Sequence, residues 1–194
     1  LRNGLSPSQA ASPSNDIAGA ARIAPLFLQK WKSDDDLVAA ARAQTSFTHG
    51  DPAVVEAAEF FARVTLAVQQ GAAIPDALRA VVPHTAWNAI PGDWFEAALA
   101  SSASAASDSS ATKAHGLTCH VPDAFPAICH LLMRHPNNGV AALTANVAAG
   151  GDSAARGMIM GMIHGAKPDA APLPEHWLTG LRAYSEIQQL IETI

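Results

Sequence analysis

Apolar residues recur at intervals of three and four positions over most of this 194-residue chain, and this spacing limits the fold more than any other feature. The clearest example is the segment 51–72, DPAVVEAAEFFARVTLAVQQGA, which places valine, alanine and phenylalanine on one face of a helix. Asp51 and Pro52 are a helix start signal, and Gly71 is a stop signal. Strands need β-branched or aromatic residues that alternate with polar ones, and this pattern is scarce. The sequence therefore predicts an all-α fold.

The same periodicity predicts further helices, at about 34–44, 74–82, 91–101, 123–134, 138–148, 153–166 and 174–193. Between two of them, residues 101–116 are rich in serine and alanine and are predicted to be a mobile loop. Hydrophobic residues make up 49% of the chain, which is enough for a sizeable core. Residues 1–194 are therefore expected to form a single helical domain.

The charge and cysteine content exclude several classes of function. Lys and Arg total only 12 in a chain of formal net charge -5, and they do not cluster, so no nucleic-acid partner is expected. No segment is apolar over the roughly 18 residues of a membrane span, and the first residues lack the apolar core of a signal peptide. Cys119 and Cys129 suggest neither a disulfide framework nor a zinc site. A cytoplasmic protein with no membrane partner is expected.

Asp152 is the most informative single acid in the sequence. It follows Gly150 and Gly151 and precedes a predicted helix, so its carboxylate lies near the positive end of a helix dipole. Two interpretations remain open. The carboxylate could cap the helix, or it could bind a metal or a ligand held at the helix start.

The helix after Asp152 has small residues at every fourth position, namely Ser153, Gly157, Gly161 and Gly165. Residues without side chains allow a neighbouring helix to approach the backbone closely. The spacing therefore predicts that the three glycines pack against another helix.

Four segments together resemble the ADP-ribosylglycohydrolase family, and they occur in the family's order. The segment 18–27, AGAARIAPLF, resembles its Gly-Ala-x-Arg-x-x-Pro motif, and 46–62 resembles its Thr-His motif with the long helix that follows. The segment 116–132 resembles its glycine-rich loop and Leu-Pro helix, and 150–152 its Gly-Gly-Asp run. The resemblance implies an all-helical domain that hydrolyses an ADP-ribosyl glycosidic linkage with magnesium.

The resemblance also implies which residues meet the ligand. Asp152 is the candidate metal ligand, and the candidate substrate-binding residues are Asn15, Asp16, His49, Gly116, Thr118, Gly150, Gly151 and Ser153. Alternatives from the residues alone remain open, because Asn and Asp are common turn formers and an isolated His is often structural. No catalytic residue is assigned from the sequence.

Two departures from the family's pattern affect the metal centre. In active members the motif continues with a second Asp and a Thr that bind the magnesium pair, and Ala154 and Ala155 stand at these positions. The family's N-terminal Thr-Asp-Asp ligands have no counterpart, since the acids of 33–36 follow the Arg-Ile-Ala-Pro segment instead of preceding it. The chain is therefore expected to be a C-terminal portion that binds magnesium poorly, with further acids supplied by a missing N-terminal portion or a partner chain.

The two alanines make the chain more similar to the crystallin-like and selenoprotein-like branch of the family, whose members are not uniformly active. Two functions are therefore considered. The first is a magnesium-dependent hydrolase that releases ADP-ribose from an N- or O-glycosidic linkage. The alternative is a catalytically impaired protein that binds ADP-ribose or another nucleotide, or has a structural role.

Overall fold

A computed structural model describes residues 4, 8–82 and 88–193, and these are almost wholly helical outside short connections. The α-helices are α1 (Ala18–Ala21), α2 (Asp34–Ser46), α3 (Pro52–Gln69), α4 (Ile74–Val81), α5 (Gly92–Ala103), α6 (Asp108–His115), α7 (Val121–Arg134), α8 (Gly139–Ala149), α9 (Ser153–Gly165), α10 (Glu175–Thr179) and α11 (Tyr184–Glu192). Two short 3-10 helices, Ser8–Ala10 and Ala24–Leu28, flank α1. The described residues contain no named strand, so the predicted all-α class is confirmed.

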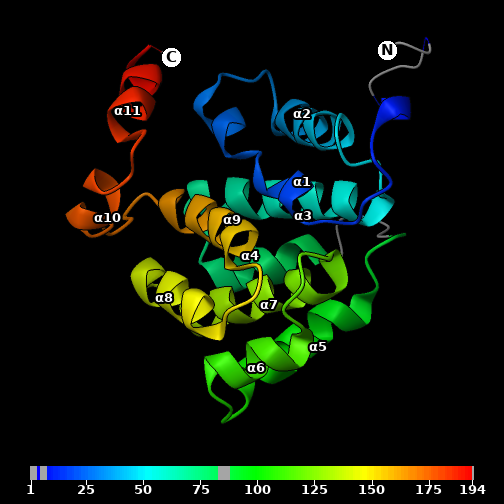
Figure 1. Ribbon diagram of the computed structural model, residues 1–194, viewed down its shortest axis with the longest axis vertical. Helices are drawn as coiled ribbons and strands as arrows, with labels where there is room; N and C mark the ends of the chain where they lie inside the picture. The colour runs from blue at the N-terminus through cyan, green and yellow to red at the C-terminus, as the bar shows by residue number, and fades with distance from the viewer. Residues whose placement is uncertain (1–3, 5–7, 83–87, 194) are drawn as a thin grey trace.

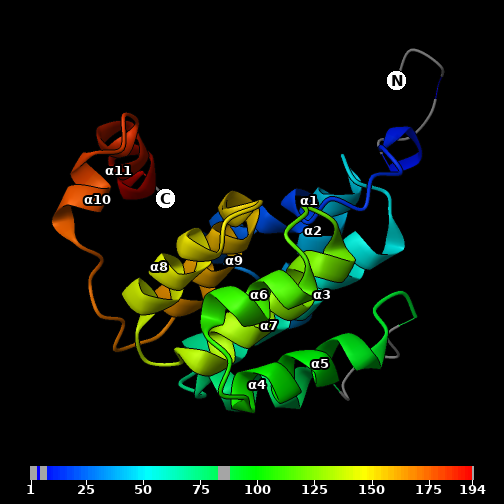
Figure 2. The same ribbon diagram turned by 60° about the horizontal axis from the view of Figure 1, so that its bottom comes forward.

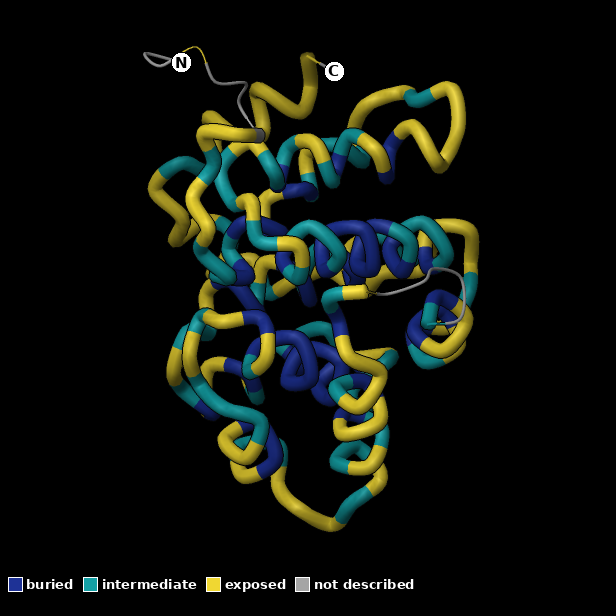
Figure 3. The backbone as a smooth tube through the Cα atoms, turned by 90° about the vertical axis from the view of Figure 1, so that its right-hand side faces the viewer, coloured by how far each residue is buried: buried dark blue, intermediate teal, exposed yellow. Residues whose placement is uncertain are grey.

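Helix α3 lies at the centre of the fold, with α1, α2, α4, α7 and α9 packed around it (Figure 1). It begins where the sequence predicts, because the Asp51 carboxylate accepts hydrogen bonds from the first-turn amides and Pro52 occupies the first helical position. Its Phe60 and Phe61 rings pack on Phe125 of α7, with ring centroids 4.9 and 5.4 Å apart. Figure 3 shows that burial is greatest along these central helices.

The predicted loop over 101–116 is wrong. Helix α5 extends to Ala103, and α6 occupies Asp108–His115. The missed helix has ordinary end signals: the Ser107 hydroxyl accepts a hydrogen bond from the Ser110 amide, and Gly116 ends the helix with a φ of 115°. The small-residue composition concealed these signals, because alanine and serine are common in both loops and short helices.

The single helix predicted over 174–193 is also wrong, because it is divided into α10 and α11. The break falls at Gly180, which follows α10 directly and has the low helix propensity of glycine. Both short helices stand apart from the rest of the molecule (Figures 1 and 2). Apolar side chains remain exposed on α11, including Ile187, Leu190 and Ile191.

A buried polar network joins α5, α6 and α7. The Ser101 hydroxyl lies 2.9 Å from His115 Nε2 and 2.9 Å from His130 Nδ1, and His130 Nε2 lies 3.6 Å from the Asp108 carboxylate. His130 is completely buried. Burial lowers its pKa to about 4, although the charge of Asp108 acts in the opposite direction. The ring is therefore neutral in the folded protein at neutral pH.

The stability of the protein is expected to decrease on acidification, because unfolding returns the pKa of His130 from about 4 to its ordinary 6.5. Between these two values the unfolded chain binds a proton that the folded chain does not. The free energy of unfolding therefore decreases as the pH is lowered, by on the order of 3 kcal/mol over the whole range between the two pKa values. His164, whose pKa is also lowered to about 4 by burial, adds a second contribution. Urea denaturation at about pH 7 and about pH 4.5 measures the change. His130→Gln should reduce the difference in free energy of unfolding between the two pH values. An unchanged difference in this variant would contradict the lowered pKa of His130.

The glycines of α9 have two different surroundings. A Cβ atom on Gly157 would lie 3.3 Å from Asn146 Nδ2 and 3.8 Å from Leu143 Cδ2, so this glycine packs against α8 as predicted. On Gly161 or Gly165 it would meet no described atom within 4 Å. The prediction that these two glycines contact a neighbouring helix is wrong, because the space beside them is open.

Substitutions at Gly161 and at Gly157 should therefore have opposite effects on stability. Gly161→Ala is expected to raise the free energy of unfolding by up to about 1 kcal/mol, because alanine favours the helix and its methyl group meets open space. Gly157→Leu is expected to lower it by about 1–3 kcal/mol, because the side chain overpacks against Asn146. Urea denaturation of both variants measures the difference, and a destabilised Gly161→Ala protein would show that the space is closed.

Candidate functional site

Most of the predicted site residues lie in loops that immediately precede α1, α3, α7 and α9, at 12–17, 48–51, 116–120 and 150–152. We call these four segments the loop cluster. Backbone hydrogen bonds join them: Ser12 pairs with Thr48 and Gly50, the Ile17 amide donates to the Cys119 carbonyl at 2.8 Å, and the Asp152 amide donates to the Leu117 carbonyl at 3.0 Å. Figure 2 shows the loop before α7 beside α1. Segments distant in sequence therefore form one connected surface.

His49 is half-buried at the start of this surface, against the backbone of α1. A Cβ atom on Gly19 would lie 2.7 Å from His49 Cγ, so only glycine leaves room for the ring. The Thr48 hydroxyl accepts a hydrogen bond from Arg22 and lies 2.9 Å from His49 Nδ1. With the hydroxyl hydrogen directed to Nδ1, the ring carries its own hydrogen on Nε2 and can donate it to a ligand.

The segments that carry Asp16 and Asp152 both pair with the loop that carries Cys119, through the Ile17–Cys119 and Asp152–Leu117 backbone hydrogen bonds. The Asp16 carboxylate accepts a hydrogen bond from the Ala18 amide at 2.8 Å, which orients it at the start of α1. The pKa of Cys119 is raised, chiefly by a hydrogen bond of its side chain to Asp16 and then by burial, and the charge of Asp152 adds to the shift. Both carboxylates therefore act on the pKa of this thiol, although they are far apart in the sequence. Asn15 joins them through its backbone, since its carbonyl accepts from the Val121 amide.

Gly116 and Thr118 shape the loop before α7. A Cβ atom on Gly116 would lie 2.2 Å from Asp123 Cγ, and its φ of 115° also favours glycine. The Thr118 hydroxyl donates to the same Asp123 carboxylate at 2.7 Å and accepts from the His120 amide. These bonds make Thr118 a structural residue of the loop in this conformation, and its predicted contact with a ligand stays a prediction.

The Gly-Gly-Asp turn is hydrogen-bonded on its inner side by a completely buried arginine, Arg156. Its guanidinium donates to the Gly150 carbonyl and, at 2.8 Å, to Asn146 Oδ1. The Asn146 amide in turn donates to the Ser153 carbonyl at 2.7 Å. Burial lowers the pKa of Arg156 and the charge of Asp152 opposes this shift, so the guanidinium remains a cation close to Asp152. The ends of α8 and α9 are thereby fixed together.

The predicted capping role of the Asp152 side chain is not observed. Asp152 is the N-cap residue of α9, but its carboxylate accepts no capping hydrogen bond. Its φ of -74° and ψ of 71° are not the extended conformation that brings a side-chain oxygen over the first turn. The turn is fixed instead by Gly151, where a Cβ atom would lie 2.2 Å from the Leu117 carbonyl oxygen. The carboxylate therefore remains available for another partner.

The described residues do not fit a two-magnesium centre. No group of three or more His, Cys, Asp or Glu side chains among them is placed to hold a metal ion. Ala154 is exposed and Ala155 is 4% exposed, so the two positions that would complete the motif offer a methyl group instead of an oxygen. A magnesium cofactor stays a prediction.

Sequence reasoning missed Arg156, Cys119 and Gly19 as parts of the site. An arginine four residues after Asp152 in an apolar helix was a usable signal, because a buried arginine needs polar partners close by. Cys119 has no signal, because nothing in the sequence indicates that its loop pairs with the segments of two aspartates. Gly19 has no signal either, because its role depends on where His49 lies.

Comparison with known proteins identifies the family of this chain. The family model of ADP-ribosylglycohydrolase matches residues 1–194, so this chain belongs to the ADP-ribosylglycohydrolase family. No curated protein matches the chain. The similarity to the crystallin-like and selenoprotein-like branch stays a prediction. Among the described residues no helix is long and apolar enough to cross a membrane, and the cytoplasmic location stays a prediction.

Replacing each of two N-cap aspartates by alanine should change the free energy of unfolding by different amounts. Asp152→Ala is expected to change the free energy of unfolding by less than about 0.5 kcal/mol, because its carboxylate makes no capping bond. Asp51→Ala is the matched control and should cost about 0.5–2 kcal/mol, because its carboxylate accepts from the Ala53 and Val54 amides. Thermal or urea unfolding measures both. Equal losses would mean that Asp152 caps α9 in solution.

Proposed function

We propose that the loop cluster binds an ADP-ribosyl group and that Asp16 and Asp152 hydrolyse its glycosidic bond. The observation that carries the proposal is that backbone hydrogen bonds of Ile17 to Cys119 and of Asp152 to Leu117 bring the segments of both aspartates to one loop, in a member of a glycohydrolase family. Hydrolysis of a glycosidic bond commonly uses two carboxyl groups, one that protonates the leaving atom and one that takes a proton from the attacking water. The reaction is derived from side chains alone, because the described residues do not fit a magnesium pair.

The surroundings of the two acids suggest different roles. Asp152 makes no capping bond and lies near the Arg156 cation, so we assign it as the base that takes the proton from water. Asp16 is oriented at the start of α1 by the Ala18 amide, and we assign its carboxyl group, in the protonated form, as the group that gives a proton to the leaving atom. His49 is assigned a binding role through its Nε2 hydrogen.

The backbone of the loop cluster supplies the remaining contacts for the ligand. It is formed at the amino-terminal ends of α3, α7 and α9, where backbone N–H groups and helix dipoles favour negative charge. The diphosphate of ADP-ribose is an anion of this kind. Gly150 is suited to a close approach, because a Cβ atom there would meet no described atom within 4 Å.

The proposal is tested by incubating the protein with peptides that carry ADP-ribose through O- or N-glycosidic bonds and measuring released ADP-ribose by chromatography. We expect release, and a loss of about 100-fold or more in kcat for Asp152→Asn and for Asp16→Asn. Asp93→Asn, at an exposed position near the start of α5, is the matched control and should retain full activity. Equal rates with magnesium and with EDTA are expected, since Ala154 and Ala155 provide no ligands.

Two outcomes would overturn parts of the proposal. Calorimetric binding of ADP-ribose without release from either substrate would show a binding protein and not a hydrolase. Activity that requires magnesium and is lost in Asp152→Asn would return Asp152 to the metal-ligand role that the sequence predicts.

A further inference from the structure

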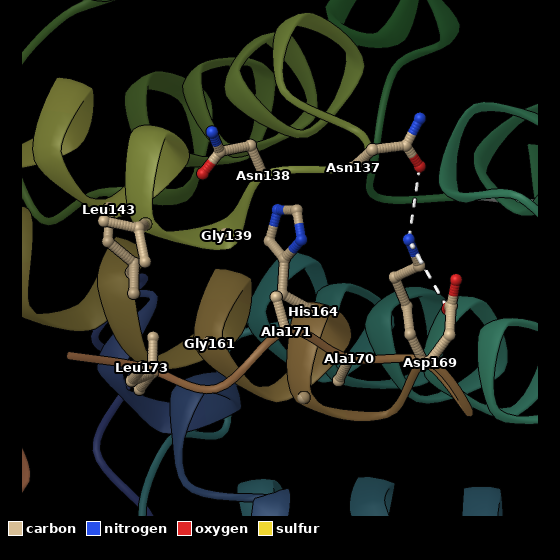
Figure 4. Close-up of a pocket in the computed structure, with 13 residues that line it drawn as sticks. Asn137, Asn138, Gly139, Leu143, Gly161, His164, Asp169, Ala170, Ala171 and Leu173 are labelled. Atoms are coloured by element: carbon tan, nitrogen blue, oxygen red, sulfur yellow. Dashed lines mark hydrogen bonds and ion pairs between the residues drawn. The ribbon is translucent and has the colours of Figure 1, made fainter. Parts of the chain in front are cut away.

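A cavity of about 210 Å³ lies at the far end of α8 and α9 from the loop cluster (Figure 4). Its walls come from the start of α8, from the end of α9 and from the chain that follows α9, including Gly139, Leu143, Gly161, His164, Lys167 and Leu173. The loop cluster lies at the other ends of the same two helices, and 13 residues of α9 span about 20 Å. The cavity is therefore separate from the proposed active site.

The start of α8 presents backbone donors to this cavity. Asn138 is the N-cap, and its side-chain oxygen accepts from the Ala141 amide at 2.9 Å. Gly139 and Val140 line the cavity, and their amides have no acceptor within the helix because these residues lie in its first turn. With the dipole of this 11-residue helix they favour a negative group.

A buried imidazole provides a second, independent indication of a ligand. His164 is 8% exposed, and its Nε2 atom is buried with no hydrogen-bond partner among the described residues. Figure 4 shows the ring extending from α9 toward Asn138 and Gly139. A Cβ atom on Gly139 would lie 3.1 Å from His164 Cγ, so the ring and the start of α8 are in close contact. A buried nitrogen without a partner is costly, and a ligand that forms a hydrogen bond with it would remove this cost.

Lys167 adds a positive charge at the rim. Its Nζ atom lies 3.2 Å from Asn137 Oδ1 and 3.7 Å from the Asp169 carboxylate. The Lys167 side chain is 17% exposed, whereas Asp169 is 83% exposed, so water screens the carboxylate far more than the ammonium group. The charge of Lys167 is thus only partly neutralised inside the cavity.

The opposite wall is apolar. Gly161 and Gly165 leave open space beside α9, and Leu143 and Leu173 border the same cavity. The volume corresponds to about seven water molecules in the liquid. A ligand that matches both walls has one anionic end and a short apolar body. Inorganic phosphate does not match, because some of its oxygens would face the apolar wall without partners.

We infer that this cavity is a binding site for a small organic carboxylate, whose charged end meets Lys167, His164 and the first amides of α8 and whose apolar body lies against Gly161 and Leu173. The inference is independent of the proposed function, because none of these residues belongs to the loop cluster.

Calorimetric titration with butyrate and benzoate tests the inference, with inorganic phosphate as the comparison. We expect the unmodified protein to bind at least one of the two carboxylates, and Lys167→Gln to bind it at least tenfold more weakly. Lys113→Gln, at an exposed position of α6, is the matched control and should bind unchanged. Gly161→Leu should also lose binding while its circular dichroism remains that of the unmodified protein, because the new side chain enters open space.

Three outcomes would overturn the inference. The first is no binding of either carboxylate to the unmodified protein. The second is equal binding by the unmodified protein and Lys167→Gln. The third is binding of phosphate as tightly as the carboxylates, which would assign the site to inorganic anions.

Discussion

The burial of α3 is the constraint on which the rest of this structure depends. Five other helices pack around it, and its Phe60 and Phe61 reach α7 through ring contacts that are completely buried. A helix with so few exposed positions cannot be stable alone, so the elements around it must be in place together. The loop cluster follows from this arrangement, because α1, α7 and α9 pack on α3 and the loops before all four helices belong to the cluster.

The loop cluster is held mainly by backbone hydrogen bonds and by one buried cation. Short loops cannot satisfy their own amides, and here they pair with one another, as Ile17 does with Cys119 and Asp152 with Leu117. Arg156 then ties the Gly150 carbonyl to α8 from inside the protein. A buried guanidinium is costly unless its hydrogen bonds are made, so the turn and the arginine depend on each other.

The small residues of α9 show that one sequence pattern can have several physical causes. Gly157 is needed because α8 lies close to its backbone. Gly151, just before α9, is needed because the Leu117 carbonyl lies close to its backbone. A Cβ atom on Gly161 or Gly165 would meet no described atom within 4 Å, and the missing side chains leave a cavity between two helices and the chain after α9. The same four-residue spacing therefore produces helix packing at one end of α9 and an open cavity at the other.

The sequence by itself determined the all-α class, the position of α3 and the family, because these depend on local periodicity, capping residues and short motifs. It also indicated most of the loop cluster through residues such as His49 and Asp152, although only by resemblance to the family. Only the tertiary structure decided that the Asp152 carboxylate is free of a capping role, because this depends on a backbone conformation imposed by Leu117. It alone brought the segments of Asp16 and Asp152 to the same loop before α7, since 136 positions separate the two aspartates and no local pattern encodes such a pairing.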